Sequence, residues 1–119
     1  MKVYRLERPE SHQGPYVGQN KDADLIAAFA LVEQTTVADE DRPGPWRDFD
    51  QYHGDYFAVP VDKIRFGFIS PQSAINWFGE TLLDLLFSIG FVLQTYEVSE
   101  DHYQISNSGK QVVFVHPRL

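Results

Sequence analysis

The spacing of apolar residues along the chain changes several times, and these changes predict its strands and helices. Residues 63–98 hold most of the large apolar side chains and are organised as strand, turn, helix and strand. Within residues 63–69 apolar side chains alternate with other residues, which is the period of a half-buried strand. Gly67 interrupts that strand, which indicates a close backbone approach or a bulge.

A helix is predicted directly after this strand. Ser70 followed by Pro71 is a typical helix start, with a side-chain cap and then proline at the first helical position. The apolar face of residues 70–89 is wide enough to reach a core. Gly79 is a candidate break within the helix, and Gly90 is placed to end it.

The remaining elements follow from the same patterns. A helix is predicted at residues 22–34, with acids at its amino end and an apolar side. Further extended segments are predicted at residues 2–7, 56–61, 91–98, 102–106 and 111–116, the last two joined by a hairpin turn at 107–109. This order predicts an α+β fold with two helices and a mostly antiparallel sheet.

Length and composition restrict the class of protein. The 119 residues suit one domain, here residues 1–119, that can bury a core without metals or disulfides. The net charge of −7 argues against binding the phosphate backbone of a nucleic acid. With no long apolar run and no signal-peptide pattern, we expect no membrane association and a location in the cytoplasm of whatever cell hosts the protein. The oligomeric state stays open.

The long irregular stretch at residues 38–55 carries a cluster of acids. Loops of this length in small domains are usually functional or mobile. Asp48, Asp50, His53 and Asp55 together offer oxygen and imidazole ligands for a divalent cation, but their spacing matches no defined metal loop. We therefore expect a solvated acidic loop and no metal site. The remaining histidines are scattered along the sequence without a catalytic partner at a telling spacing.

Three short segments carry a possible nucleotide site. Arg5 lies on the first strand, Ser70 ends a middle strand, and Gln111 opens a late strand. This layout resembles the ADP-ribosyltransferases of the arginine–serine–glutamate class. The chain also resembles a type of short phage-encoded protein that opens with a tyrosine–arginine strand and a glycine–proline–tyrosine loop, here residues 14–16.

The transferase resemblance implies a split antiparallel sheet and a cleft for NAD. Arg5 would contact a phosphate or ribose of the cofactor, and Ser70 would bind the nicotinamide ribose. Tyr16 or Trp46 would stack on the nicotinamide ring. The position of the catalytic glutamate is Gln111, whose amide stabilises a cationic transition state poorly. Glu97 or Glu100, the nearest acids, would then have to supply the carboxylate.

Each of these residues also has a purely structural interpretation. Arg5 would be a solvated or paired surface residue, Ser70 a helix cap and Gln111 an exposed polar residue. Without the catalytic carboxylate, the transferase fold would be present with weak activity or none.

A second function is consistent with the same composition. A compact acidic domain with exposed aromatic residues suits a non-enzymatic inhibitor of a host protein that has a basic surface. Trp46, Tyr52 and Tyr56 beside the acids would anchor such a partner, with Asp48 and Asp50 supplying charge. The two hypotheses are therefore a phage accessory protein with a nucleotide cleft and an acidic binder of a host protein.

Overall fold

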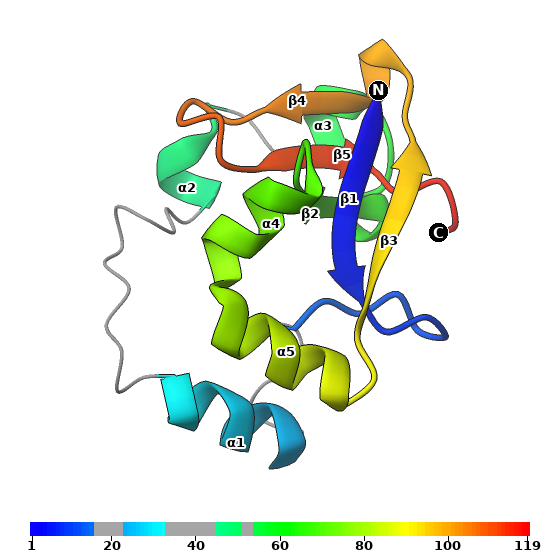
Figure 1. The fold of residues 1–119 in the computed structure, drawn as a ribbon. Coiled ribbons are helices and arrows are strands. Elements are labelled where there is room, and N and C mark those ends of the chain that lie inside the picture. The colour runs from blue at the N-terminus through cyan, green and yellow to red at the C-terminus, as the bar shows by residue number, and fades with distance from the viewer. Residues whose placement is uncertain (16–22, 33–44, 51–53) are drawn as a thin grey trace.

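The fold is that of a computed structural model, which describes residues 1–15, 23–32, 45–50 and 54–119. These residues form an α+β domain with two antiparallel sheets (Figure 1). The strands are β1 (Lys2–Glu7), β2 (Ile64–Gly67), β3 (Val92–Glu97), β4 (Tyr103–Ile105) and β5 (Val112–Val115). The longer helices are α1 (Ala23–Val32), α4 (Pro71–Phe78) and α5 (Glu80–Ser88), and the four-residue helices are α2 (Pro45–Asp48) and α3 (Gly54–Phe57).

The first sheet joins distant parts of the chain. β1 pairs antiparallel with β3, from Lys2 opposite Glu97 to Glu7 opposite Val92. The second sheet has the order β2-β5-β4. The two sheets touch through a bridge between Tyr4 and Phe68, whose backbone groups exchange hydrogen bonds of 2.7 and 2.8 Å. The first strand therefore lies between segments that are far apart in the sequence.

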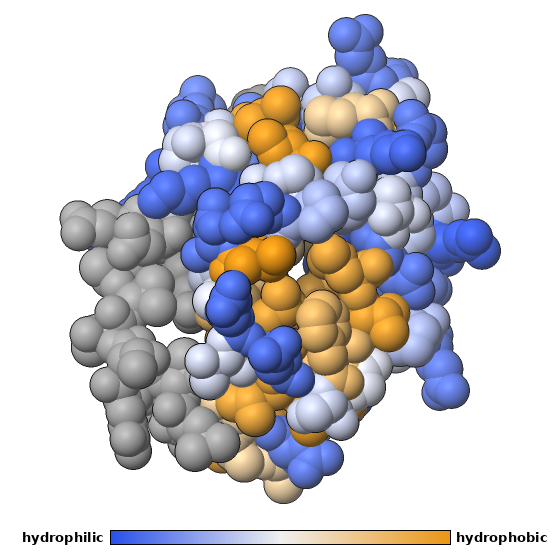
Figure 2. All heavy atoms as spheres, in the orientation of Figure 1, coloured by the Kyte–Doolittle hydropathy of each residue, from blue (hydrophilic) through white to orange (hydrophobic). Residues whose placement is uncertain are grey.

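Apolar side chains fill three layers between and around these sheets. One cluster packs α1, α4 and α5 against Leu6 and Phe68. A second lies between the sheets and includes Val3, Tyr96 and Phe114. A third, around Phe49, covers the other face of the β2-β5-β4 sheet. Figure 2 shows apolar residues exposed over α5 and the neighbouring strands, bordered by hydrophilic ones.

Gly67 is required where the two sheets meet. A Cβ atom at this position would lie 2.7 Å from the backbone oxygen of Tyr4 and 2.8 Å from Cγ1 of Val3. This confirms the close backbone approach predicted from a glycine within a strand.

The helix predicted at residues 70–89 forms as two helices. Ser70 caps α4 by accepting a hydrogen bond of 3.1 Å from the backbone N–H of Ser73. Gly79 then adopts φ 79° and ψ 154°, a conformation open mainly to glycine, and separates α4 from α5. The candidate break at Gly79 is therefore confirmed.

The prediction of an extended segment at residues 56–61 is wrong. Tyr56 and Phe57 belong to α3, and a 3₁₀ turn occupies Val61–Lys63. Between them Ala58 has φ 57°, in the left-handed region, so the backbone turns instead of continuing straight. Burial of Phe57 in the third apolar cluster stabilises this local helix.

In the described part of the chain, no helix has the length and apolar character needed to cross a bilayer.

Candidate functional site

A buried carboxylate, Glu7, lies at the end of β1. The alternation of side chains along β1 places Val3, Arg5 and Glu7 on the face that is turned toward β5. The Glu7 side chain is 0% exposed. A charged group in such a position is stable only if it is paired and hydrogen-bonded.

Four groups supply that pairing. Arg5 Nε and His116 Nε2 each lie 3.0 Å from Oε2 of Glu7. The Tyr96 hydroxyl donates to Oε1, and Nδ1 of His12 lies 3.2 Å from the same oxygen. A carboxylate accepts about four hydrogen bonds, so these groups satisfy Glu7 fully. We call Glu7 and these four partners the Glu7 centre.

The pKa values in the Glu7 centre follow from burial and hydrogen bonding. Burial opposes ionisation of Glu7, but hydrogen bonds from His116, Tyr96 and His12 together prevail and lower its pKa to about 2. Burial and the neighbouring carboxylate both raise the pKa of Tyr96. Burial lowers the pKa of Arg5, an effect that Glu7 partly offsets. The centre therefore holds a carboxylate that stays ionised at neutral pH.

The ligand set of a metal centre is present here. Glu7, His12 and His116 offer one ligand atom each, all within 4.8 Å of one another. However, Nδ1 of His116 accepts a hydrogen bond of 3.1 Å from the backbone N–H of Arg118. Nε2 of the neutral ring must then carry the proton, and it donates that proton to Glu7. This tautomer leaves Nε2 without a lone pair for a metal, so the contacts favour a hydrogen-bonded centre.

The Arg5 side chain is bound by the protein itself. Besides Glu7, its guanidinium donates to the backbone oxygens of Phe66 at 2.8 Å and His12 at 3.2 Å. Gly14 lies against it, since a Cβ atom there would be 3.0 Å from Nη2. The interpretation of Arg5 as a solvated or paired surface residue is correct in the pairing, which is with Glu7, but wrong in the surface position, because Arg5 is only 6% exposed. Its guanidinium could bind a phosphate only after releasing these contacts.

Gln111 is also buried, which corrects the prediction that it is exposed. Its Nε2 donates to Oδ2 of Asp48 at 2.9 Å. Asp48 further accepts from the backbone N–H and the hydroxyl of Ser108, each at 2.8 Å. These bonds outweigh the effect of burial and lower the pKa of Asp48. Gln111 thus helps to fasten α2 to the β4–β5 hairpin.

The expectation of a solvated acidic cluster is wrong for Asp48, which is buried, whereas Asp50 is exposed. Tyr16, Tyr52 and His53 lie outside the described residues, as do the side chains of Trp46 and Asp55.

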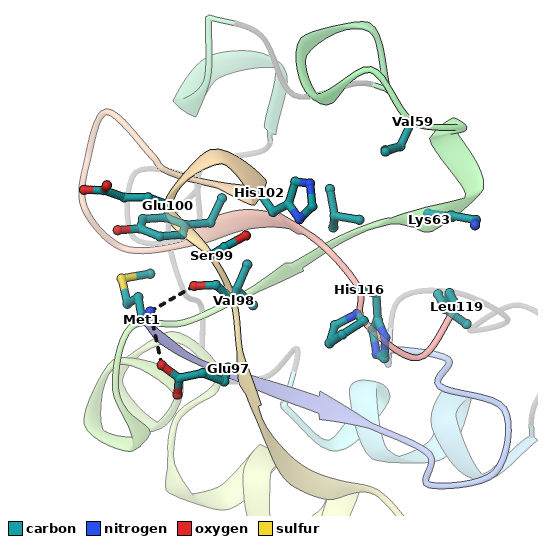
Figure 3. A pocket seen from close by; sticks show the side chains of 13 residues that line it. Met1, Val59, Lys63, Glu97, Val98, Ser99, Glu100, His102, His116 and Leu119 are labelled. Carbon is teal, nitrogen blue, oxygen red and sulfur yellow. Dashed lines mark hydrogen bonds and ion pairs between the residues drawn. The ribbon is translucent and has the colours of Figure 1, made fainter.

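An open groove lies beside the Glu7 centre (Figure 3). Its volume is about 890 Å³, and its walls come from the end of β3, the segment before β4 and the residues after β5. Glu97 and Glu100 line one end, and Lys63 lines the other. His116 belongs to both the groove and the Glu7 centre. The groove is therefore a surface feature built directly on the buried centre.

The predicted nucleotide-site residues do not meet in this groove. Glu97 and Glu100 line it, but Arg5, Ser70 and Gln111 do not. Ser70 caps α4, as its structural interpretation predicts. Each of these three residues therefore has a structural role in the fold.

Sequence reasoning missed most of the Glu7 centre. His12 and His116 are far apart in the sequence, yet the centroids of their rings lie 4.9 Å apart. A signal was present, because Glu7 shares the strand face of Val3, and His116 continues the alternation of Val112 and Phe114. The pairing of β1 with β3, which places Tyr96 beside them, is not visible in that pattern.

The comparisons with known proteins identify a family. A family model described as Bacteriophage T4 Y00F protein matches residues 1–118. No curated protein and no solved structure matches the chain.

Proposed function

Because the chain belongs to the bacteriophage T4 Y00F protein family, we propose that it is an accessory protein that binds a basic host protein through the groove. It acts in the host cell as a binding protein without catalytic activity. The observation that carries this proposal is the open groove, whose acidic end holds Glu97 and Glu100.

The charge of the chain supports a basic partner. A net charge of −7 steers positively charged surfaces toward the protein and repels acidic ones. The side chain of Glu97 is 74% exposed, although it lies 3.4 Å from the amino group of Met1. An exposed carboxylate beside apolar groove walls suits a side chain that combines an aliphatic stem with a charged end, as lysine and arginine do.

The Glu7 centre supports a binding role more than a catalytic one. Its carboxylate is 0% exposed and is satisfied by four partners, so no acceptor position remains for a substrate. A general base must reach the proton that it removes, which Glu7 cannot do from this position. We infer that the centre fixes the wall of the groove through His116.

The surface proposed here differs from the one expected from sequence. Asp48 is buried and bonded, so it is not free to attract a partner. Tyr56 is 47% exposed and stays a candidate anchor outside the groove. We therefore propose Glu97 and Glu100, in place of the acidic loop, as the residues that attract the partner.

The nucleotide-cleft hypothesis stays a prediction, and so does the ADP-ribosyltransferase-like split sheet. An active transferase would need Arg5 released from its protein contacts and a carboxylate where Gln111 now binds Asp48. Glu97 lines the groove, but Arg5 and Gln111 do not. For this reason we rank binding of a host protein first.

The proposal is tested by retention of host proteins on the immobilised chain. We expect a discrete host protein that is released by salt, because screening weakens attraction between exposed charges. The double variant Glu97→Lys/Glu100→Lys should lose it. The control Glu10→Lys/Asp84→Lys makes the same charge change at exposed positions outside the groove and should retain it. Equal retention by both variants, or no retained protein, would contradict the proposal.

A further inference from the structure

The strand β3 lies at the edge of the first sheet, with β1 on one side (Figure 1). Its backbone groups that point away from β1 can be identified from the hydrogen bonds. Met1 and Val98 exchange two bonds of 2.9 Å, so they form a hydrogen-bonded pair. In an antiparallel ladder such pairs alternate with pairs whose backbone groups point outward.

The alternation assigns three outward-facing residues to β3. Counting from Met1 and Val98, the backbone groups of Leu93, Thr95 and Glu97 point away from β1. The opposite side of β1 agrees with this assignment, since Tyr4, the partner of Thr95, directs its own backbone groups to Phe68. We call the backbone groups of Leu93, Thr95 and Glu97 the outer edge of β3.

Within the described part of the chain, β3 lacks three of the features that usually prevent strand addition. Exposed edge strands are commonly protected by lysine, proline or a bulge. The sequence of β3, VLQTYE, contains no lysine and no proline, and its register with β1 is continuous over six residues. Val92 and Thr95 are exposed and favour extended structure.

The charge around the edge indicates what could add to it. Glu97 belongs to the outer edge and also lines the acidic end of the groove, so the two surfaces are continuous. A second copy of the chain would bring another net charge of −7 to this edge, which disfavours pairing of two copies. A segment with lysine or arginine would instead complement Glu97 and Glu100.

We propose that an extended, basic segment of the host partner adds to the outer edge of β3 as a further strand and continues into the acidic end of the groove. The inference rests on the proposed function, because it gives the binding mode at the same site. Backbone hydrogen bonds to Leu93, Thr95 and Glu97 supply affinity, and the acids select lysine or arginine in the segment.

The test uses a displayed library of short linear peptides selected on the intact protein. We expect selected peptides to combine β-branched residues with lysine or arginine. Their binding should fall at least tenfold in Thr95→Pro, which removes an outward N–H while leaving the ladder to β1 intact. Thr95→Val keeps that N–H and should bind as the unchanged protein does.

A second measurement guards against misfolding of Thr95→Pro. N-methylation of alternate amides in a selected peptide should abolish binding in one of the two alternating patterns only, because one set of amides faces β3. Selection of no peptide, or binding that survives both Thr95→Pro and either methylation pattern, would overturn the proposal. So would a dimer of the unchanged chain that Thr95→Pro dissociates. A host protein retained equally by Thr95→Pro and the unchanged chain would contradict the strand addition alone, leaving the proposed function intact.

Discussion

Nε2 of His116 lies 3.0 Å from Oε2 of Glu7, although the two residues are 109 positions apart in the sequence. This bond connects the end of β1 to the segment that follows β5. With Arg5 and Tyr96 it joins both sheets around one buried negative charge. Several consequences of this arrangement and of its surroundings can be measured.

Glu7→Gln should destabilise the fold by about 3 kcal/mol, because it removes one partner of a buried ion pair. Arg5 would remain buried with its charge uncompensated, and His116 would lose an anionic acceptor. Denaturant unfolding monitored by circular dichroism measures the change. Glu97→Gln is the matched control at an exposed carboxylate, and we expect it to stay within about 0.5 kcal/mol. Equal effects of the two substitutions would contradict a central role for Glu7.

Stability should fall when the pH is lowered from about 4.5 toward 2. The folded-state pKa of Glu7 is lowered to about 2 from an ordinary value of 4.5. Between these values the unfolded state binds more protons, so stability is complete above 4.5 and is lost as the pH approaches 2.

The control for this pH dependence is Glu7→Gln, which has no carboxyl at that position. The difference in unfolding free energy between the unchanged protein and this variant should shrink across the same pH range. A constant difference from pH 7 to pH 2 would show that Glu7 does not titrate with a lowered pKa in the folded protein.

Gln111→Glu should destabilise the β4–β5 hairpin by about 1–3 kcal/mol. The new carboxylate would replace a donor that lies 2.9 Å from Oδ2 of Asp48, so two negative charges would face each other in a buried site. Gln13→Glu adds the same charge at an exposed position and should be nearly neutral. Thermal unfolding measures both. A stable Gln111→Glu variant that hydrolyses NAD would instead support the nucleotide-cleft hypothesis.

Gly67→Ala should cost more than Gly109→Ala, although both add one methyl group. At Gly67 the methyl group would lie 2.7 Å from the Tyr4 oxygen, so β1 and β2 would have to move apart. We expect a loss of about 3 kcal/mol, at the upper end for overpacking, because the nearest atom belongs to the backbone and cannot rotate away. At Gly109 the added methyl group has no atom within 4 Å. The cost of about 1–2 kcal/mol comes only from the left-handed backbone conformation, with φ 76°. Urea unfolding of both variants tests this order.

Local patterns predicted much of the secondary structure. Residues 2–7 form β1 as expected, and Ser70, Gly79 and Gly109 occupy the cap, break and turn positions that their chemistry favours. These features depend on a few neighbouring residues. The prediction of an extended segment at residues 56–61 fails because a distant contact decides the structure there. Phe57 packs against a strand that is far away in the sequence.

The Glu7 centre was less predictable because its members lie far apart in the sequence. Glu7 is followed by Arg8 and Pro9, which makes it resemble an ordinary surface acid. Only the pairing of β1 with β3 and the placement of β5 beneath them bring Tyr96 and His116 to it. For the same reason the sequence indicates Arg5 as a candidate for nucleotide binding but does not indicate the protein groups that its guanidinium already binds.

The long sequence separation within the Glu7 centre also affects when the protein can mature during synthesis. Synthesis reaches Glu7 89 residues before Tyr96 and 109 residues before His116. Until then β1 has no partner strand, and its carboxylate has no buried environment to enter. Contacts of such high separation slow folding, and the Glu7 centre can close only after residue 116 has been made. A nascent chain stalled before residue 92 should therefore stay sensitive to proteases, with β1 exposed to chaperones.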